Sequence, residues 1–234
     1  MFHFKKFSID DSMAAMKIGT DAVLLGAWTI CKDEIRILDI GTGSGILALM
    51  MAQRNKGVPV DAVDLDQDAA KLATENVQLS PWNDQIQIFN TSIQAFSSQA
   101  ANKYSLVICN PPFFTDSLKG PGKARNMARH NDSMSISDLL ESTSKILAKN
   151  GKAAFIFPAD AFDTWLKEGK RNSLFPSRVT HLKSSATTKP HRIMIEFIFE
   201  EIPFIIENEL IIYKTQSEFS KEYISLTKDF YLKF

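Results

Sequence analysis

The stretch that decides the fold is Ile37-Leu38-Asp39-Ile40-Gly41-Thr42-Gly43-Ser44-Gly45, which is followed by the apolar run Ile46 to Ala52. It predicts a β-strand, a glycine turn and an α-helix in immediate succession. The three glycines permit positive φ angles and a close approach of a ligand to the backbone, while the first helical turn offers unpaired N–H groups. The stretch therefore predicts a ligand site at the carboxyl end of a strand.

An acid stands at the end of the next predicted strand. Val60 to Leu65 is apolar apart from Asp61 and Asp64, and an acid in the position of Asp64 binds ribose hydroxyls in related βαβ units. The structural alternative is that it caps the helix that begins near Asp66. The alternate spacing of the three glycines fits the G-x-G-x-x-G pattern of dinucleotide folds poorly. A nucleotide-containing ligand other than a nicotinamide cofactor is therefore favoured.

A third feature is Asn110-Pro111-Pro112-Phe113, which follows the predicted strand Ser105 to Cys109. The asparagine oxygen accepts a hydrogen bond from an amino group, and the prolines leave their preceding carbonyls without local N–H partners. The phenylalanine ring offers a stacking face. By itself this tetrapeptide is also an ordinary strand-ending turn. Together with the glycine turn and the acid, it predicts a pocket that holds a flat amine.

Strands and helices alternate after residue 35, which predicts an α/β fold with a mostly parallel sheet covered on both faces. The expected strands are 35–40, 60–65, 86–90, 105–109, 153–157, 178–184 and 192–200, and the expected helices are 45–54, 67–79 and 137–147. A strand at 210–213 and an amphipathic helix at 219–231 follow. We expect a single domain over residues 1–234, with an N-terminal segment at 1–34, a core at 35–200 and a C-terminal extension at 201–234.

Composition limits the classes of function. The chain has 27 lysines and arginines against 27 aspartates and glutamates, so nucleic-acid binding would need a local patch. The start has no apolar secretory region, and no run approaches the length of a membrane span. The 2 cysteines exclude a disulfide framework, and no histidine or cysteine cluster has zinc spacing. We expect a cytoplasmic protein without a membrane, a metal or an obligate protein partner.

Six stretches together resemble one family. They are Met16 to Trp28, Asp39 to Gly45, Ser80 to Trp82, Asn110 to Phe113, Ala128 to His130 and Asp229 to Leu232. The family is that of the bacterial tRNA(Val) adenine-N6 methyltransferases, which belong to the class I S-adenosylmethionine-dependent methyltransferases. The resemblance implies their Rossmann-like fold, a seven-stranded, mostly parallel sheet with an antiparallel last strand. It also implies S-adenosylmethionine as cofactor and a tRNA substrate, methylated on the exocyclic N6 of the adenine just 3′ of the anticodon, adenine 37.

The resemblance also implies roles for individual residues. The residues implied to hold the reacting amine are Asn110, Pro111, Pro112 and Phe113, and those implied to bind the cofactor are Lys17, Thr20, Asp21, Asp39, Gly41, Gly43, Gly45, Asp64, Leu65, Ser92, Ile93 and Asn110. By position alone, Thr20 and Asp21 are candidates for a helix N-cap. Many relatives carry an acid after the third strand that binds the cofactor adenine. This chain has Ser92 at that position. We expect the Ser92 hydroxyl and the N–H of Ile93 to contact the cofactor adenine in place of the acid.

Basic residues follow the amine pocket. The first group is Lys119, Lys123, Arg125, Arg129 and His130, and a second group is Lys167, Lys170, Arg171, Arg178, Lys183, Lys189 and Arg192. A charge run is usually a solvated face. Beside a base pocket it predicts contacts with RNA phosphates, with Lys189 and Arg192 as the candidates from the second group. An adenine must also leave its stack before it enters such a pocket.

Four alternatives remain. Methylation of N5 of a glutamine in a release factor uses the same tetrapeptide, but those enzymes carry a substantial N-terminal helical domain, and here the first strand begins by residue 35. Methylation of N2 of a guanine in ribosomal RNA is disfavoured only by the flanking motifs. An RNA module that binds the cofactor without catalysis is opposed by the intact Asn110, Pro111 and Phe113. A nicotinamide oxidoreductase is opposed by the glycine spacing.

Overall fold

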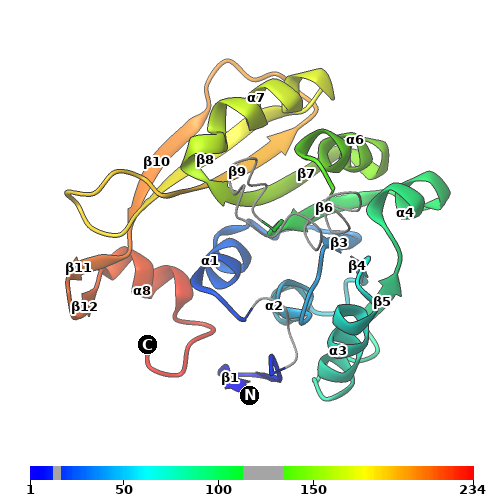
Figure 1. Ribbon diagram of the computed structural model, residues 1–234, viewed down its shortest axis with the longest axis horizontal. Coiled ribbons are helices and arrows are strands. Elements are labelled where there is room, and N and C mark those ends of the chain that lie inside the picture. The colour runs from blue at the N-terminus through cyan, green and yellow to red at the C-terminus, as the bar shows by residue number, and fades with distance from the viewer. Residues whose placement is uncertain (13–16, 113–133) are drawn as a thin grey trace, which may run out of the picture.

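The computed structural model (Figure 1) describes residues 1–12, 17–112 and 134–234. The strands of the central sheet are β3 Ile37–Ile40, β4 Val60–Asp64, β5 Ile86–Asn90, β6 Tyr104–Cys109, β7 Leu147–Pro158, β8 Phe175–Lys183, β9 Arg192–Ile198 and β10 Ile206–Ile211. The α-helices are α1 Thr20–Trp28, α2 Ile46–Arg54, α3 Gln67–Gln78, α4 Ile93–Gln99, α6 Ile136–Ile146, α7 Phe162–Arg171 and α8 Lys221–Thr227. Two small hairpins pair β1 Phe2–His3 with β2 Ser8–Ile9, and β11 Tyr213–Thr215 with β12 Glu218–Phe219. A short 3-10 helix covers Ala159–Ala161.

The central sheet has the order β10-β8-β9-β7-β6-β3-β4-β5. Strand β9 runs antiparallel to both of its neighbours, and every other neighbouring pair is parallel. The seven predicted core strands and the antiparallel last strand are thereby confirmed. The eighth strand, β10, comes from the C-terminal extension and lies at the edge of the sheet. The strand order reverses between β3 and β6, and ligands of such sheets bind at the carboxyl ends of the strands beside this reversal.

Alternating side chains divide the interior into two cores. On β3, Ile37 belongs to one core and Leu38 to the other, as the two-residue period of a strand requires. The first core lies under α1, α2 and the C-terminal segment, and the second lies under α4, α6 and α7. Figure 1 shows the sheet between these two sets of helices. Both faces of the sheet are therefore buried, which leaves its carboxyl edge as the place for a ligand.

The predicted elements differ from the observed ones in several places, including the predicted strand 210–213, which is observed as β10 at Ile206–Ile211. Helices α4 and α7 were not predicted, because α4 is short and rich in glutamine and serine, and α7 begins soon after Pro158, behind the 3-10 helix Ala159–Ala161. Strand β7 begins at Leu147, ahead of the predicted start of this strand at residue 153, and its pairing with β6 shifts register between these residues. Helix α8 is shorter than expected because Phe219 lies in β12 and Ser220 caps the helix. No helix within the described ranges is long and apolar enough to cross a membrane.

Two arginines attach the C-terminal end of α1 to the body of the protein. Arg54 donates from Nη1 to the carbonyls of Gly26 and Thr29, each at 2.6 Å. Arg178 donates to the carbonyl of Trp28 at 3.1 Å, and its guanidinium lies 3.6 Å from the centre of the Trp28 ring. Cations at the end of a helix complement the partial negative charge of its free carbonyls. These contacts attach the C-terminal end of α1 to α2 and β8.

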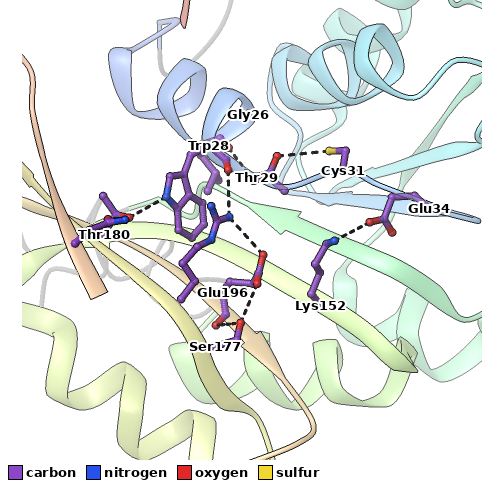
Figure 2. Close-up of polar contacts among 12 residues, drawn as sticks. Gly26, Trp28, Thr29, Cys31, Glu34, Lys152, Ser177, Thr180 and Glu196 are labelled. Carbon is purple, nitrogen blue, oxygen red and sulfur yellow. Dashed lines mark hydrogen bonds and ion pairs between the residues drawn. The ribbon is translucent and has the colours of Figure 1, made fainter. Parts of the chain in front are cut away.

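Figure 2 shows the surroundings of Trp28, including Thr180, Ser177 and Glu196. The indole N–H donates to Thr180 Oγ1 at 2.9 Å, and Glu196 lies 3.4 Å from Arg178. Burial lowers the pKa of Arg178, and the carboxylate of Glu196 opposes that shift. Arg178 is one of the second basic group, which was considered as an extension of the RNA contacts, but its charge is paired inside the protein.

A second buried network joins β3, β4 and β6 at the opposite, amino edge of the sheet. Asp61 is buried and accepts two hydrogen bonds from Arg36, from Nε at 2.7 Å and from Nη2 at 2.9 Å. The hydroxyl of Tyr104 donates to the same carboxylate at 2.6 Å. Burial, followed by the nearby Asp61 charge, raises the pKa of Tyr104, so that its hydroxyl stays protonated and keeps donating.

We expect Asp61→Ala to lower the free energy of unfolding by about 3 kcal/mol, because it leaves Arg36 and Tyr104 without their shared acceptor. Tyr104→Phe removes one hydrogen bond to a charged group and keeps the ring, so its expected loss is about 1.5 kcal/mol. Urea denaturation of both variants measures the two losses. Equal losses would contradict the assignment of Asp61 as the centre of the network.

Candidate active site

The glycine turn lies where β3 ends and α2 begins. Gly41, Gly43 and Gly45 have φ angles of 68°, 56° and 88°, which side chains other than glycine rarely adopt. A Cβ atom on Gly41 or Gly43 would meet nothing within 4 Å, whereas one on Gly45 would lie 3.5 Å from Ala73 of α3. A distance of 3.5 Å is an ordinary van der Waals contact, so Gly45 is needed for its positive φ rather than for space. Gly41 and Gly43 leave backbone exposed to open space beside the sheet.

A carboxylate lies directly beneath this turn. Asp39 is 0% exposed, and its Oδ2 accepts hydrogen bonds from Thr42 Oγ1 at 2.6 Å and from the N–H of Ala48 at 3.1 Å. Its Oδ1 is buried and has no hydrogen-bond partner among the described residues. Burial raises the pKa of Asp39 from 3.8 to about 7, although the two hydrogen bonds oppose the shift. Asp39 thus organises the turn from below, and its contact with a cofactor stays a prediction.

A second carboxylate lies beside the turn, at the end of β4. Asp64 accepts a hydrogen bond from the N–H of Gly43 at 2.8 Å and another from the N–H of Asp66 at 3.0 Å. Burial raises its pKa, and these hydrogen bonds oppose the shift. Each carboxylate oxygen keeps a further lone pair, which is available to a ribose hydroxyl. Next to it the side chain of Leu65 is 56% exposed, and an exposed apolar surface of this kind suits the flat ring of an adenine.

The amide of Asn110 lies on the other side of the turn. Strand β6 pairs with β3 so that Cys109 is opposite Ile40, and Ile40 is opposite Val63 of β4. The residues one position further along β6, β3 and β4 are therefore Asn110, Gly41 and Asp64, respectively. Because neighbouring strands are ~4.8 Å apart, Asn110 and Asp64 are separated by about 10 Å across the glycine turn. This spacing suits an elongated ligand with the turn at its middle.

The tetrapeptide is described in part. Pro111 is buried, Pro112 is exposed, and Asn110 is partly exposed and makes no side-chain hydrogen bond to another described residue. Phe113 lies outside the described residues, so its predicted stacking role stays a prediction.

The residues after β5 form a cap. The Ser92 hydroxyl accepts a hydrogen bond from the N–H of Ala95 at 3.1 Å, and Ile93 is the first residue of α4. Asn90 donates from Nδ2 to the carbonyls of Asp64 and Leu65, at 3.0 and 3.1 Å. The amide of Asn90 thus fixes the backbone at the end of β4. The predicted contacts of Ser92 and Ile93 with a cofactor remain predictions.

The N-terminal segment meets the carboxyl edge through an ion pair. Asp21 Oδ2 lies 2.8 Å from Arg192 Nε, and Arg192 is opposite Pro158 at the carboxyl end of β7. The structure thus brings together a candidate cofactor residue and a candidate RNA residue. Gly19 is the N-cap of α1, without a side-chain hydrogen bond, so the prediction of Thr20 or Asp21 as the cap is wrong. Lys17 donates to the carbonyls of Asp11 and Ser12, at 2.6 and 2.9 Å.

Asn76 is a residue that the sequence interpretation missed. It is buried in α3, and its Nδ2 donates to the carbonyls of Asp10 and Ser44, each at 2.9 Å, while its Oδ1 accepts from the N–H of Asp10 at 2.8 Å. It therefore ties the N-terminal segment to the glycine turn. An asparagine in the last turn of a predicted helix, among residues that favour the helix more, is the only local signal that could have pointed to it.

Of the candidate RNA-binding residues, Lys189 and Arg192 lie in the described part of the chain. Lys189 is exposed in the connection between β8 and β9, at the carboxyl edge of the sheet. Other members of the second basic group pair within the protein: Arg171 with Glu168 and Lys183 with Glu209. Lys119, Lys123, Arg125, Arg129 and His130 lie outside the described residues. Among the residues that are described, no cluster of histidine, cysteine, aspartate and glutamate is arranged to hold a metal ion.

Comparison with known proteins identifies the family. The methyltransferase small domain family matches residues 12–158. A tRNA1(Val) (adenine(37)-N6)-methyltransferase of Parabacteroides distasonis is 40% identical over 99% of this chain and 98% of the relative. Proteins of the same name from Bacteroides fragilis and Trichodesmium erythraeum are 41% and 40% identical, over 99% and 100% of this chain and 98% of each relative. The chain belongs to this methyltransferase family. The prediction of the family from the sequence is confirmed.

Solved structures agree with the fold of this methyltransferase. A predicted O-methyltransferase from Agrobacterium tumefaciens superimposes with a TM-score of 0.72 at 18% identity, over 90% of this chain and 96% of the other. A geranyl diphosphate methyltransferase, solved with geranyl diphosphate and sinefungin, gives 0.54 at 12% identity, over 76% of each chain. At such low identity these similarities support the class I methyltransferase fold and nothing more specific.

The stability of this methyltransferase is expected to depend on pH through Asp39. Between pH 3.8 and about 7 the unfolded chain loses the Asp39 proton while the folded protein keeps it, so the folded state binds more protons and stability falls as pH rises. Asp39→Asn removes this dependence. Denaturation between pH 4 and 8 measures the free energy of unfolding of the wild type and of Asp39→Asn. The wild-type value minus the variant value should fall by up to about 1.4 kcal/mol per pH unit and level off above pH 7. A constant difference would contradict the buried, protonated carboxyl.

Asp64→Ala is expected to weaken binding of S-adenosylhomocysteine about tenfold or more, because it removes a charged acceptor for ribose and the anchor of the Gly43 N–H. Asp66→Ala is the matched control. It removes the N-cap carboxylate of α3, which accepts hydrogen bonds from the N–H groups of Asp68 and Ala69, and so lowers stability. It does not remove the proposed acceptor for ribose. Calorimetric titration of both variants separates the two roles. Equal losses of affinity would contradict the role of Asp64.

Proposed function

We propose that this protein transfers a methyl group from S-adenosylmethionine to the exocyclic N6 of adenine 37 in tRNA1(Val). The observation that carries the proposal is the placement of the Asn110 amide beside an open glycine turn, in a chain that matches curated tRNA1(Val) (adenine(37)-N6)-methyltransferases over almost its whole length. The relatives favour this substrate over a glutamine in a release factor or a guanine in ribosomal RNA.

The residues at the carboxyl edge fit the cofactor. The backbone of Gly41 and Gly43 borders space that a Cβ atom would enter, so a ligand can lie against it. Asp64 supplies acceptors for the ribose hydroxyls, and the exposed Leu65 supplies an apolar surface for the adenine. S-adenosylmethionine, when bound there, supplies an electrophilic methyl group. We infer that the methionine end extends toward Asn110 and under the segment around Lys17, Thr20 and Asp21.

Asn110 and Pro111 act on the amine of the substrate. An exocyclic amine is a poor nucleophile because its lone pair is delocalised into the ring. The Asn110 side-chain oxygen and the Pro111 carbonyl each accept one amine hydrogen, which favours a tetrahedral nitrogen and directs its lone pair at the methyl carbon. No strong base is required, because the nitrogen becomes acidic only after it is methylated and then loses its proton to water. Most of the acceleration comes from the alignment of the reacting atoms.

The RNA must present an unstacked adenine, at a cost of a few kcal/mol or less in a loop. We infer that Phe113 stacks on this base and that the basic residues after it, with Lys189, contact phosphates. The free energy of these contacts offsets the cost of unstacking the adenine. Arg192 contributes to the same edge while it is paired with Asp21.

The test is methyl transfer from labelled S-adenosylmethionine to tRNA from a strain that lacks the gene, with mass spectrometry of the nucleosides and mapping of the modified position. The proposal expects N6-methyladenosine at position 37 of tRNA1(Val). Label in ribosomal RNA or in a release factor, and none in tRNA, would keep the chemistry and refute the substrate.

The variant Asn110→Ala is expected to lose at least about a hundredfold in kcat, because it removes an acceptor that acts in the transition state. Its affinity for S-adenosylhomocysteine should stay within about twofold of the wild type. Single-turnover methylation of tRNA and calorimetric titration measure the two quantities. A loss of cofactor affinity as large as the loss of rate would show that Asn110 holds the cofactor rather than the amine.

A further inference from the structure

A cavity of about 410 Å³ lies between the two ends of the chain and the start of α1. Six aromatic side chains line it: Phe2, Tyr213, Phe219, Tyr223, Tyr231 and Phe234. The cavity is large enough for a small planar ligand. Of the described candidate cofactor residues only Thr20 lines it, and the glycine turn, Asp64 and Asn110 do not. It is therefore distinct from the site of methyl transfer.

The aromatic rings form an ordered column. Tyr213 and Phe219 are stacked with their centres 5.0 Å apart, and Phe219 and Tyr223 are stacked at 4.8 Å. Phe234 meets Phe219 and Tyr231 edge-on, at 5.3 and 5.6 Å. Tyr213 ends the column and is 39% exposed. A column of rings with an accessible end is a surface on which a further flat ring stacks.

The rim of the cavity is polar and cationic. Lys233 and His3 are exposed residues of its lining, and among the described residues no carboxylate lies within ion-pair distance of Lys233. Lys5 holds the C-terminal segment in place by donating to the backbone oxygens of Lys228 and Phe234, at 2.7 and 2.5 Å. Flat apolar walls beside a cation fit a ligand that joins an aromatic ring to an anion, as a nucleotide does.

The cavity lies on the same side of the protein as the candidate active site. Ile18, Gly19 and Thr20 line it, and the next residue, Asp21, pairs with Arg192 at the carboxyl edge. Arg192 is on β9, two strands from Asn110 on β6, which is about 10 Å. In Figure 1, α8 lies beside α1, and the β11–β12 hairpin lies beyond α8. Contacts from the cavity through α1 and the Asp21–Arg192 ion pair therefore lead to the sheet edge that carries Asn110.

We propose that the aromatic cavity binds a second unstacked base of the RNA substrate, from a nucleotide near the methylated adenine in the same loop. This proposal rests on the proposed function. Capture of a second base would help hold the loop open, and it would make recognition depend on a neighbouring nucleotide as well as on the target.

The test compares Tyr213→Ala with Tyr213→Phe, which keeps the ring. The matched control is Phe204→Ala. It removes a ring of a residue that is 85% exposed in the connection before β10, at the amino edge of the sheet and away from the carboxyl edge. With an anticodon stem-loop RNA as substrate, Tyr213→Ala should raise KM for RNA about fivefold or more, whereas kcat and the affinity for S-adenosylhomocysteine stay unchanged. Tyr213→Phe and Phe204→Ala should behave as the wild type. A fall in cofactor affinity would overturn the proposal.

An RNA with one missing base identifies the partner of Tyr213. Each loop nucleotide other than the target is replaced in turn by an abasic one. At one position, loss of the base should raise the KM of the wild type for RNA about as much as Tyr213→Ala does. Tyr213→Ala tested on that abasic RNA should then show no further increase in KM. Additive effects at every position would refute the cavity as a base site. Absence of methylation of the intact RNA by the wild type would instead refute the proposed function, and this proposal with it.

Discussion

The carboxylate of Asp39, buried beneath the glycine turn, is the constraint on which the ligand edge of this protein depends. The turn must reverse direction within five residues, with three glycines at positive φ. The hydrogen bonds from Thr42 and Ala48 to the carboxylate join the turn to the first residues of α2. Removal of the carboxylate from water is costly, and its raised pKa expresses that cost. The two hydrogen bonds offset part of it.

Topology then places the rest of the site. Because the strand order reverses between β3 and β6, the turn that follows β3 has an acid on one side and an amide on the other. Asp64 holds the Gly43 N–H from the β4 side, and Asn110 extends from β6. The N-terminal segment closes the same edge through the Asp21–Arg192 ion pair and through Asn76. Binding of the donor and activation of the amine are thus divided between neighbouring strands.

Local sequence was sufficient for the features that depend on local chemistry. The glycine turn, the acid that ends β4 and the amide that follows β6 are each specified within a few residues, and the alternating pattern predicted seven strands. The aromatic cavity is different, because Tyr213, Tyr231 and Phe2 come together only through long-range pairing of the chain ends. Likewise Arg178 is indistinguishable in sequence from a solvated cation, and only the packing of Trp28 against β8 buries it.

The most direct measurement is a crystal structure of the protein with sinefungin and an anticodon stem-loop of tRNA1(Val). The account predicts that the exocyclic nitrogen of adenine 37 lies within about 3 Å of both Asn110 Oδ1 and the Pro111 carbonyl, with the sinefungin ribose on Asp64. An adenine whose amine contacts neither acceptor, while its ring occupies another part of the carboxyl edge, would contradict the assignment of Asn110 and the mechanism built on it.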